Sequence, residues 1–188
     1  MASLNPPVCD FGWQAPEFKL PGVDGKDWAL SDIKGVNGTL VMFICNHCPY
    51  VQAIRERLVA DIKALRSMGV NTVAISSNDT VTYPDDGFDK MQEVAREFKF
   101  PFPYLLDESQ EVAKAYGAVC TPDFFGFNAH LELQYRGRFD EQGRNMIPLE
   151  TSSRDLYHAM KLVAETGHGP VEQVPSIGCS IKWFSDDK

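Results

Sequence analysis

The hydrophobic positions of the chain change their period around residues 39–75. A nearly continuous apolar run from Thr39 to Ile44 is typical of a β-strand that is covered on both faces. After Pro49 the apolar residues recur at the spacing of an amphipathic helix, and they are Val51, Ile54, Leu58, Ile62 and Leu65. Gly69 is expected to end this helix, and residues 70–75 form a second apolar strand. This order predicts a right-handed βαβ unit whose ligand crevice lies at the carboxyl ends of the strands.

Weaker patterns on both sides of this unit predict the rest of the fold. Upstream, Asp24-Gly25 between two short segments is typical of a hairpin turn. Downstream, the pattern predicts helices at 88–98, 107–116 and 152–165, and strands at 104–106, 123–127 and 131–135. The last strand alternates apolar and polar residues, which favours an antiparallel strand with one solvated face. Ser152 and Asp155 have capping-box spacing before the last helix, and the Gly- and Pro-rich tail after Gly167 is expected to be irregular.

Length and charge favour one globular domain and exclude several classes of partner. A chain of 188 residues with 44% hydrophobic positions suits a single domain spanning 1–188, with a core at about 15–165 and a tail at 166–188. The net charge of −8 argues against nucleic acid and anionic membranes, since both bind clustered Lys and Arg. No apolar run approaches the ~20 residues of a membrane span. The start at Met1-Ala2-Ser3 lacks the features of a signal peptide, so we expect a cytoplasmic protein.

Five cysteines supply the candidate chemistry, namely Cys9, Cys45, Cys48, Cys120 and Cys179. Their odd number and wide spacing argue against a structural disulfide framework. Cys45 and Cys48 have the Cys-x-x-Cys spacing of either a redox pair or half of a zinc site. The pair stands between a buried strand and a helix N-terminus, where unpaired N–H groups favour a thiolate. We therefore expect a dithiol–disulfide pair, with no metal and no other cofactor.

The order of elements and two motifs carry a resemblance to a known family. The motifs are Phe43-Ile44-Cys45-Asn46-His47-Cys48-Pro49 and Thr121-Pro122 before an antiparallel pair. Over about residues 15–165 the chain resembles the thioredoxin fold, in the branch of alkyl hydroperoxide reductase/thiol-specific antioxidant proteins and thioredoxin-like reductases of cytochrome maturation. The resemblance implies an α/β fold with a central mixed sheet flanked by helices, an N-terminal hairpin extension and a C-terminal tail. It also implies that Pro122 is cis and faces the cysteine pair.

The motif departs from ordinary thioredoxins in a way that bears on the two cysteines. In that family a longer segment separates the strand from the first cysteine, whereas Cys45 follows the strand at once. If the family pattern is aligned with this sequence without a gap, Cys48, followed by Pro49, takes the place of the first catalytic cysteine of the family. Pro49 also fits best as the first helical residue, with Cys48 as N-cap, because a proline at the fourth position would delete a helical hydrogen bond. We favour Cys48 as the thiolate and Cys45 as its disulfide partner.

Other residues near these motifs have two interpretations each. Thr121 and Pro122 form a substrate platform if the residue before a cis proline pairs with an extended substrate strand; otherwise Pro122 is an ordinary loop proline. His47 either tunes the thiolate or is solvated. Cys120 is a third redox thiol or an inert buried one. Cys179, a second candidate for a third redox thiol, lies between apolar residues in a polar tail, and we expect that segment to dock on the domain.

Three further features are assigned no role in the chemistry. Cys9 is incidental. Arg136-Gly137-Arg138 is expected to be a solvated turn, although it offers anion-binding groups. The acidic group at 85–89 is expected to complement the dipole of a helix N-terminus.

Together these features predict a thiol–disulfide oxidoreductase. Its partners would be a protein or small-molecule disulfide or peroxide substrate and an external thiol reductant. A thiol peroxidase is the first alternative, although the segment before Cys48 lacks a Thr at the spacing of the family. A copper-handling module is the second, because His47-Cys48-Pro49 resembles part of the Sco-type copper-chaperone site and thiolates with imidazole suit copper. The Cys-x-x-x-Cys spacing of that family is absent.

Overall fold

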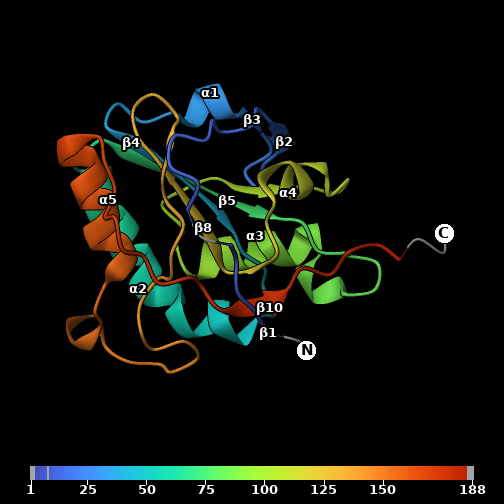
Figure 1. Cartoon of the computed structure of the whole chain (residues 1–188). Helices are drawn as coiled ribbons and strands as arrows, with labels where there is room; N and C mark the ends of the chain where they lie inside the picture. The colour runs from blue at the N-terminus through green and yellow to red at the C-terminus, as the bar shows by residue number, and fades with distance from the viewer. Residues whose placement is uncertain (1–2, 8, 186–188) are drawn as a thin grey trace.

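A mixed five-stranded sheet forms the centre of the molecule (Figure 1). The computed structural model describes residues 3–7 and 9–185; Met1 and Ala2 of the expected start lie outside the described residues, as do residues 8 and 186–188. The strand order is β6-β5-β4-β8-β9; β4, β5 and β6 are parallel to one another, and β8 pairs antiparallel with both β4 and β9. The bounds are β4 (Gly38–Phe43), β5 (Val70–Ser76), β6 (Tyr104–Leu106), β8 (Asp123–Phe127) and β9 (Leu133–Tyr135). The predicted βαβ unit and the central position of its first strand are confirmed.

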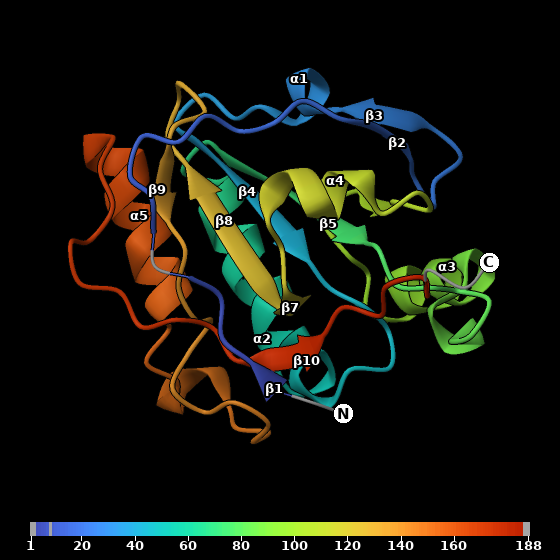
Figure 2. The same cartoon turned by 45° about the vertical axis from the view of Figure 1, so that its right-hand side comes forward.

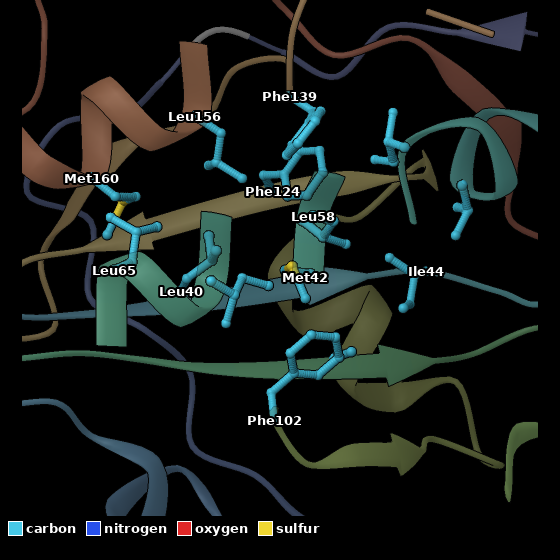
Figure 3. Packing of buried hydrophobic residues seen from close by; sticks show 14 of the residues in the cluster. Leu40, Met42, Ile44, Leu58, Leu65, Phe102, Phe124, Phe139, Leu156 and Met160 are labelled. Atoms are coloured by element: carbon cyan, nitrogen blue, oxygen red, sulfur yellow. The ribbon is translucent and has the colours of Figure 1, made fainter. Parts of the chain in front are cut away.

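Alternate residues of β4 point to opposite faces of the sheet, so the strand is buried on both sides. Leu40 and Met42 join one apolar cluster, shown in Figure 3, with Leu58 of α2 (Pro49–Arg66) and Leu156 of α5 (Asp155–Thr166). The helix α3 (Phe88–Glu97) contributes Met91 to the same cluster. This face holds α2 against the sheet and thereby fixes the position of its N-terminus.

The opposite face packs Val41 and Phe43 against a second apolar cluster. Tyr116 of α4 (Glu111–Tyr116) lies in this cluster, its ring 5.6 Å from that of Phe43. The predicted hairpin is confirmed as β2 (Lys19–Pro21) and β3 (Asp27–Ala29), with Gly25 at φ +81° in its turn, followed by α1 (Leu30–Ile33). Two 3-10 turns, η1 (Pro84–Asp86) and η2 (Leu149–Thr151), lie in the connecting loops.

A second, three-stranded sheet joins segments that are far apart in the sequence. Its order is β1 (Ser3–Leu4), β10 (Gly178–Ser180) and β7 (Cys120–Thr121). Figure 2 shows β1 and β10 side by side near α2, with β7 next to β10. The C-terminal tail is irregular for most of its length, as predicted, but β10 is an added strand that the sequence pattern did not indicate.

Three sequence predictions differ from the structure in their details. The strand β9 has no solvated face, because the tail covers it: Gln134 is buried and its side-chain oxygen accepts from the Gly169 N–H at 3.2 Å. The last helix begins at Asp155, and no capping box forms, because the Ser152 hydroxyl donates to Asp140 instead at 3.0 Å.

Among the described residues, no helix combines the length and apolar character needed to cross a bilayer. The single-domain interpretation stays a prediction.

Candidate active site

Cys48 is the N-cap of α2, and Pro49 is the first helical residue. The proline lacks an N–H at a position where the helix has no partner for one. The next turn does supply a donor, because the backbone N–H of Val51 is directed at the Cys48 sulfur. The predicted placement of Cys48 at the positive end of the helix is confirmed, and its side chain is 0% exposed.

Hydrogen-bond donors converge on the Cys48 sulfur and lower its pKa to about 5. The largest contribution is the hydrogen bond from the Cys45 thiol, and Thr121, the Val51 N–H and the Cys179 thiol add to it, against the opposing effect of burial. When protonated, Cys48 donates instead to the Thr121 carbonyl oxygen, 3.1 Å away. On deprotonation, Cys48 gives up its one hydrogen bond to Thr121 and accepts several from the surrounding donors. These donors therefore determine that the pKa of Cys48 is lowered.

Cys45 has the opposite electrostatic setting, and its pKa lies well above the usual value of a thiol. Its hydrogen bond to Cys48 holds the proton, and burial and the negative charge of Asp86 raise the pKa further. The two cysteines, separated by two residues, therefore differ in the reduced protein: their surroundings favour a thiolate at Cys48 and a protonated thiol at Cys45.

The Thr121-Pro122 peptide bond is cis, as the resemblance implied, and lies directly against the cysteine pair. The Thr121 carbonyl oxygen contacts Cys48, and the Thr121 hydroxyl lies 3.4 Å from the Cys45 sulfur. Asp123, the residue after Pro122, forms an ion pair with Arg136, whose guanidinium donates to the Asp123 carboxylate at 3.1 Å. Burial raises the pKa of Asp123 to about 6, and the guanidinium opposes that shift.

Arg136 was expected in a solvated turn, and this expectation is wrong. Its guanidinium is buried, donates to the Gly117 carbonyl at 2.7 Å and lies over the Phe125 ring at 4.4 Å. Burying an arginine is costly unless its donors find partners; here Nη2 donates to Gly117 and Asp123, whereas the buried Nε has no hydrogen-bond partner.

The backbone of Thr121 already pairs with the chain's own tail. Cys179 of β10 stands opposite Thr121 in an antiparallel register. The Cys179 side chain is 4% exposed and donates to Cys48, and burial followed by that contact raises its pKa to about 11. The tail segment thus docks on the domain, as expected, and it does so beside Cys48. The role of Cys179 as a third redox thiol stays a prediction.

The other two cysteines lie outside this contact. Cys120 is buried on β7, donates to the Pro122 carbonyl at 3.5 Å and has its pKa raised by burial. Cys9 packs against the second apolar cluster, on the opposite face of the sheet from Cys48. Burial raises the pKa of the Cys9 thiol to about 11 and outweighs the hydrogen bonds from Gln173 and from the Arg136 N–H, which favour its thiolate.

Asp86, which was expected only to complement a helix dipole, is a central part of the site. It is 0% exposed, and one of its oxygens accepts from the backbone N–H groups of Asn46 and His47 at 2.7 and 3.2 Å. The other accepts from the side chain of Asn78 at 2.8 Å and lies 2.6 Å from His47 Nδ1. The His47 ring also stacks on Tyr83, with centroids 5.6 Å apart. His47 is therefore held by the protein, and its tuning role stays a prediction.

Asn46 ties the turn between the cysteines to two other elements. Its side-chain oxygen accepts from the buried Tyr104 hydroxyl at 3.0 Å. Its backbone carbonyl accepts from Gln52 at 3.0 Å and from Arg55 at 2.9 Å, and the Arg55 guanidinium lies over the Phe98 ring. These contacts fix the backbone between Cys45 and Cys48, so the two sulfurs are held in place before reaction.

A metal could use part of the same site. The ligand atoms of Cys45, His47 and Asp86 all lie within 4.8 Å of one another. A sulfur, an imidazole nitrogen and a carboxylate oxygen suit zinc or copper. All three groups are already satisfied by hydrogen bonds within the protein, so their arrangement does not by itself require an ion.

The pKa separation gives a direct titration test. In the reduced protein the ultraviolet absorbance of the thiolate should rise with an inflection near pH 5. Cys45→Ala removes the largest stabilising donor, so that inflection should move up toward the ordinary thiol value of about 8.5. Cys120→Ala is the matched control and should leave the inflection in place. An unchanged inflection in Cys45→Ala would contradict the assignment of Cys45 as donor.

Comparisons with known proteins identify chains to which this one is similar. The family model described as AhpC/TSA family matches residues 11–139. The crystal structure of an uncharacterized conserved protein from Geobacillus kaustophilus is 44% identical, with a TM-score of 0.92, and the match covers 99% of this chain and 98% of that one.

Two more distant proteins carry names. Thiol-disulfide oxidoreductase ResA from Bacillus thuringiensis is 24% identical over 119 residues, and this chain spans 62% of the length of that curated relative. The thioredoxin domain of a thiol-disulfide oxidoreductase from Bacteroides vulgatus is 18% identical with a TM-score of 0.57, over 67% of this chain and 86% of that one. The thioredoxin-like fold is thereby confirmed.

Proposed function

Since the chain belongs to the AhpC/TSA family, we propose that it is a thiol–disulfide oxidoreductase in which Cys45 and Cys48 form a reversible disulfide. One observation carries the proposal: a low-pKa thiolate at a helix N-terminus receives a hydrogen bond from a second cysteine three positions before it. The family and the likeness to ResA support this function. The substrate class is a disulfide, and the reductant is an external thiol.

The reaction divides into two exchanges. The Cys48 thiolate attacks one sulfur of the substrate disulfide, and the other sulfur leaves as a thiolate. Cys45 then attacks Cys48, forms the Cys45–Cys48 bond and releases the second substrate sulfur, so two electrons pass from the protein to the substrate. An external dithiol reverses both exchanges and returns the protein to its reduced state.

The hydrogen bond between the two thiols determines which of the two exchanges comes first. In the reduced protein, donation to Cys48 is the largest cause of the raised pKa of Cys45. Once Cys48 is in a mixed disulfide, its sulfur carries no negative charge, and that cause is removed. The pKa of Cys45 should therefore fall only after the first exchange. The His47 nitrogen and the Asp86 oxygen, both within 4.8 Å of Cys45, are the candidate acceptors of its proton.

The test is the redox couple itself. The protein is equilibrated with defined ratios of reduced and oxidised glutathione, alkylated and digested, and the masses of the cysteine peptides are measured. We expect a two-electron transition that joins Cys45 to Cys48 within the tryptic peptide 35–55. Cys120→Ser should leave the transition unchanged. Absence of the Cys45–Cys48 disulfide at every ratio would end this proposal.

A thiol peroxidase is the second candidate, favoured by the family and by the lowered pKa of Cys48. It requires peroxide to reach a sulfur that is fully covered in the reduced protein. Stopped-flow mixing with hydrogen peroxide separates the two functions. Oxidation of Cys48 to sulfenic acid faster than its exchange with a disulfide would displace the oxidoreductase.

Copper handling rests on the cluster of Cys45, His47 and Asp86. Titration of the reduced protein with Cu(I) against a competing chelator measures the affinity and the stoichiometry of copper binding. Stoichiometric binding that is lost in His47→Ala and kept in His130→Ala would favour a copper module, because His130 lies outside the cluster.

A further inference from the structure

The strand β10 takes the place that the platform would offer to an extended substrate. It pairs with β7 in an antiparallel register, with Cys179 opposite Thr121 and Ser180 opposite Cys120. The approach is close, because a Cβ on Gly178 would lie 2.2 Å from the Thr121 carbonyl oxygen. Thr121 is the residue before the cis proline, so the tail uses the backbone edge that β-strand addition requires.

The tail also places a thiol against the proposed nucleophile. The Cys179 thiol donates to the Cys48 sulfur, and Cys45, Cys48 and Cys179 belong to one buried cluster. A sulfur in this position, on a strand paired to Thr121, is where an incoming disulfide sulfur would stand.

Contacts on both sides of β10 hold it in this register. Before the strand, the Ser176 hydroxyl donates to the Pro122 carbonyl at 2.8 Å. After it, the Lys182 N–H donates to Asn78 at 2.9 Å, and the Lys182 carbonyl accepts from Gln110 at 2.8 Å. The strand is thus a docked element of the site and not a chain end that passes nearby.

We propose that β10 is an internal substrate strand and that Cys179 is a third redox residue, which forms a disulfide with Cys48. The proposal rests on the proposed function and deepens it, because it adds a route by which the oxidised pair exchanges within the chain. It also makes the tail a competitor of external substrates, which reach Cys48 only when β10 leaves Thr121.

The internal exchange balances without a further reactant. The Cys179 thiolate attacks Cys48 in the Cys45–Cys48 disulfide, the Cys48–Cys179 bond forms, and Cys45 leaves as a thiolate. The proton lost by Cys179 is taken up by Cys45, and no electrons enter or leave the protein. After attack on an external disulfide, the same Cys179 thiolate can displace the substrate from Cys48, releasing the second substrate thiolate.

The Cys45→Ser variant isolates the exchange, because it removes the competing partner of Cys48. The reduced variant is treated with one equivalent of oxidised glutathione, alkylated and digested with trypsin. The three inner sites lie on separate peptides, 35–55, 115–136 and 162–182. We expect peptides 35–55 and 162–182 to be joined through Cys48 and Cys179, with two glutathione molecules released. Cys45→Ser/Cys120→Ser should give the same product.

A glutathione adduct that persists on Cys48 while Cys179 is alkylated would overturn the proposal. That result leaves the proposed function intact if the unmodified protein still forms the Cys45–Cys48 disulfide. Failure of the proposed function is a different outcome, in which neither protein reacts with glutathione at Cys48. Circular dichroism of the reduced variant checks that it is folded.

Gly178→Ala tests the strand without changing a cysteine. The added methyl would meet the Thr121 carbonyl, so β10 should separate from β7 and Cys48 should become accessible. We expect alkylation of Cys48 by iodoacetamide to be at least about tenfold faster than in the unmodified protein. Val171→Ala, at an exposed position of the same tail, is the control and should not change the rate. An unchanged rate in folded Gly178→Ala would contradict the covering role of β10.

Discussion

Cys48→Ser is expected to abolish the fast reaction of the reduced protein with a disulfide. The rate of thiolate release from an aromatic disulfide should fall by about a thousandfold or more, because a serine hydroxyl stays protonated at neutral pH. The reason is specific to this position, since Cys48 is the cysteine whose pKa is lowered, to about 5. The measurement is single-turnover mixing, with release of the coloured thiolate followed by absorbance.

The neighbouring cysteines supply the controls for that measurement. Cys45→Ser should keep a first release of one thiolate equivalent, because Cys48 still attacks, and its second release should then depend on Cys179. Cys120→Ser should release two equivalents at the rate of the unmodified protein, because Cys120 donates to Pro122 and not to Cys48. Retention of the fast phase in Cys48→Ser, with its loss in Cys45→Ser, would reverse the assigned roles.

The parts of the site that sequence predicted correctly are local ones. Continuous burial of β4 follows from one apolar run, and the start of α2 follows from Pro49. Because Pro49 fits best as the first helical residue, local proline chemistry agreed with the family pattern in placing Cys48 at the N-cap. The cis Pro122 came from the family resemblance, and the structure confirms it.

The parts that sequence missed depend on contacts between distant segments. The three residues of β10 have no periodicity of their own, and their strand conformation comes from pairing with Thr121 and Ser3. Periodicity arguments treat charged residues as solvated, whereas Asp86 and Arg136 are buried against hydrogen-bond partners from other segments of the chain. Two adjacent acidic residues before a helix gave no signal that one of them would turn inward.

Asp86→Asn is expected to lower the free energy of unfolding of the reduced protein by about 2–4 kcal/mol. The carboxylate provides two oxygens, one for the N–H groups of Asn46 and His47 and the other for the side chains of His47 and Asn78. An amide of the same shape keeps one oxygen and directs its NH₂ group at donors that it cannot satisfy. Urea denaturation with an unchanged slope would show that the loss arises in the folded state.

The same substitution should change the site in two ways that a general loss of stability would not produce. The negative charge of Asp86 contributes to the raised pKa of Cys45, so Asp86→Asn should lower that pKa and bring the second thiolate inflection to lower pH. Asn78 links Asp86 to the tail through the Lys182 N–H, so alkylation of Cys48 should also become faster. Asp85→Asn is the matched control, because Asp85 is the adjacent exposed carboxylate. If the two variants had the same unfolding midpoint and the same Cys45 inflection, Asp86 could not be the group that joins the cysteine turn to the tail.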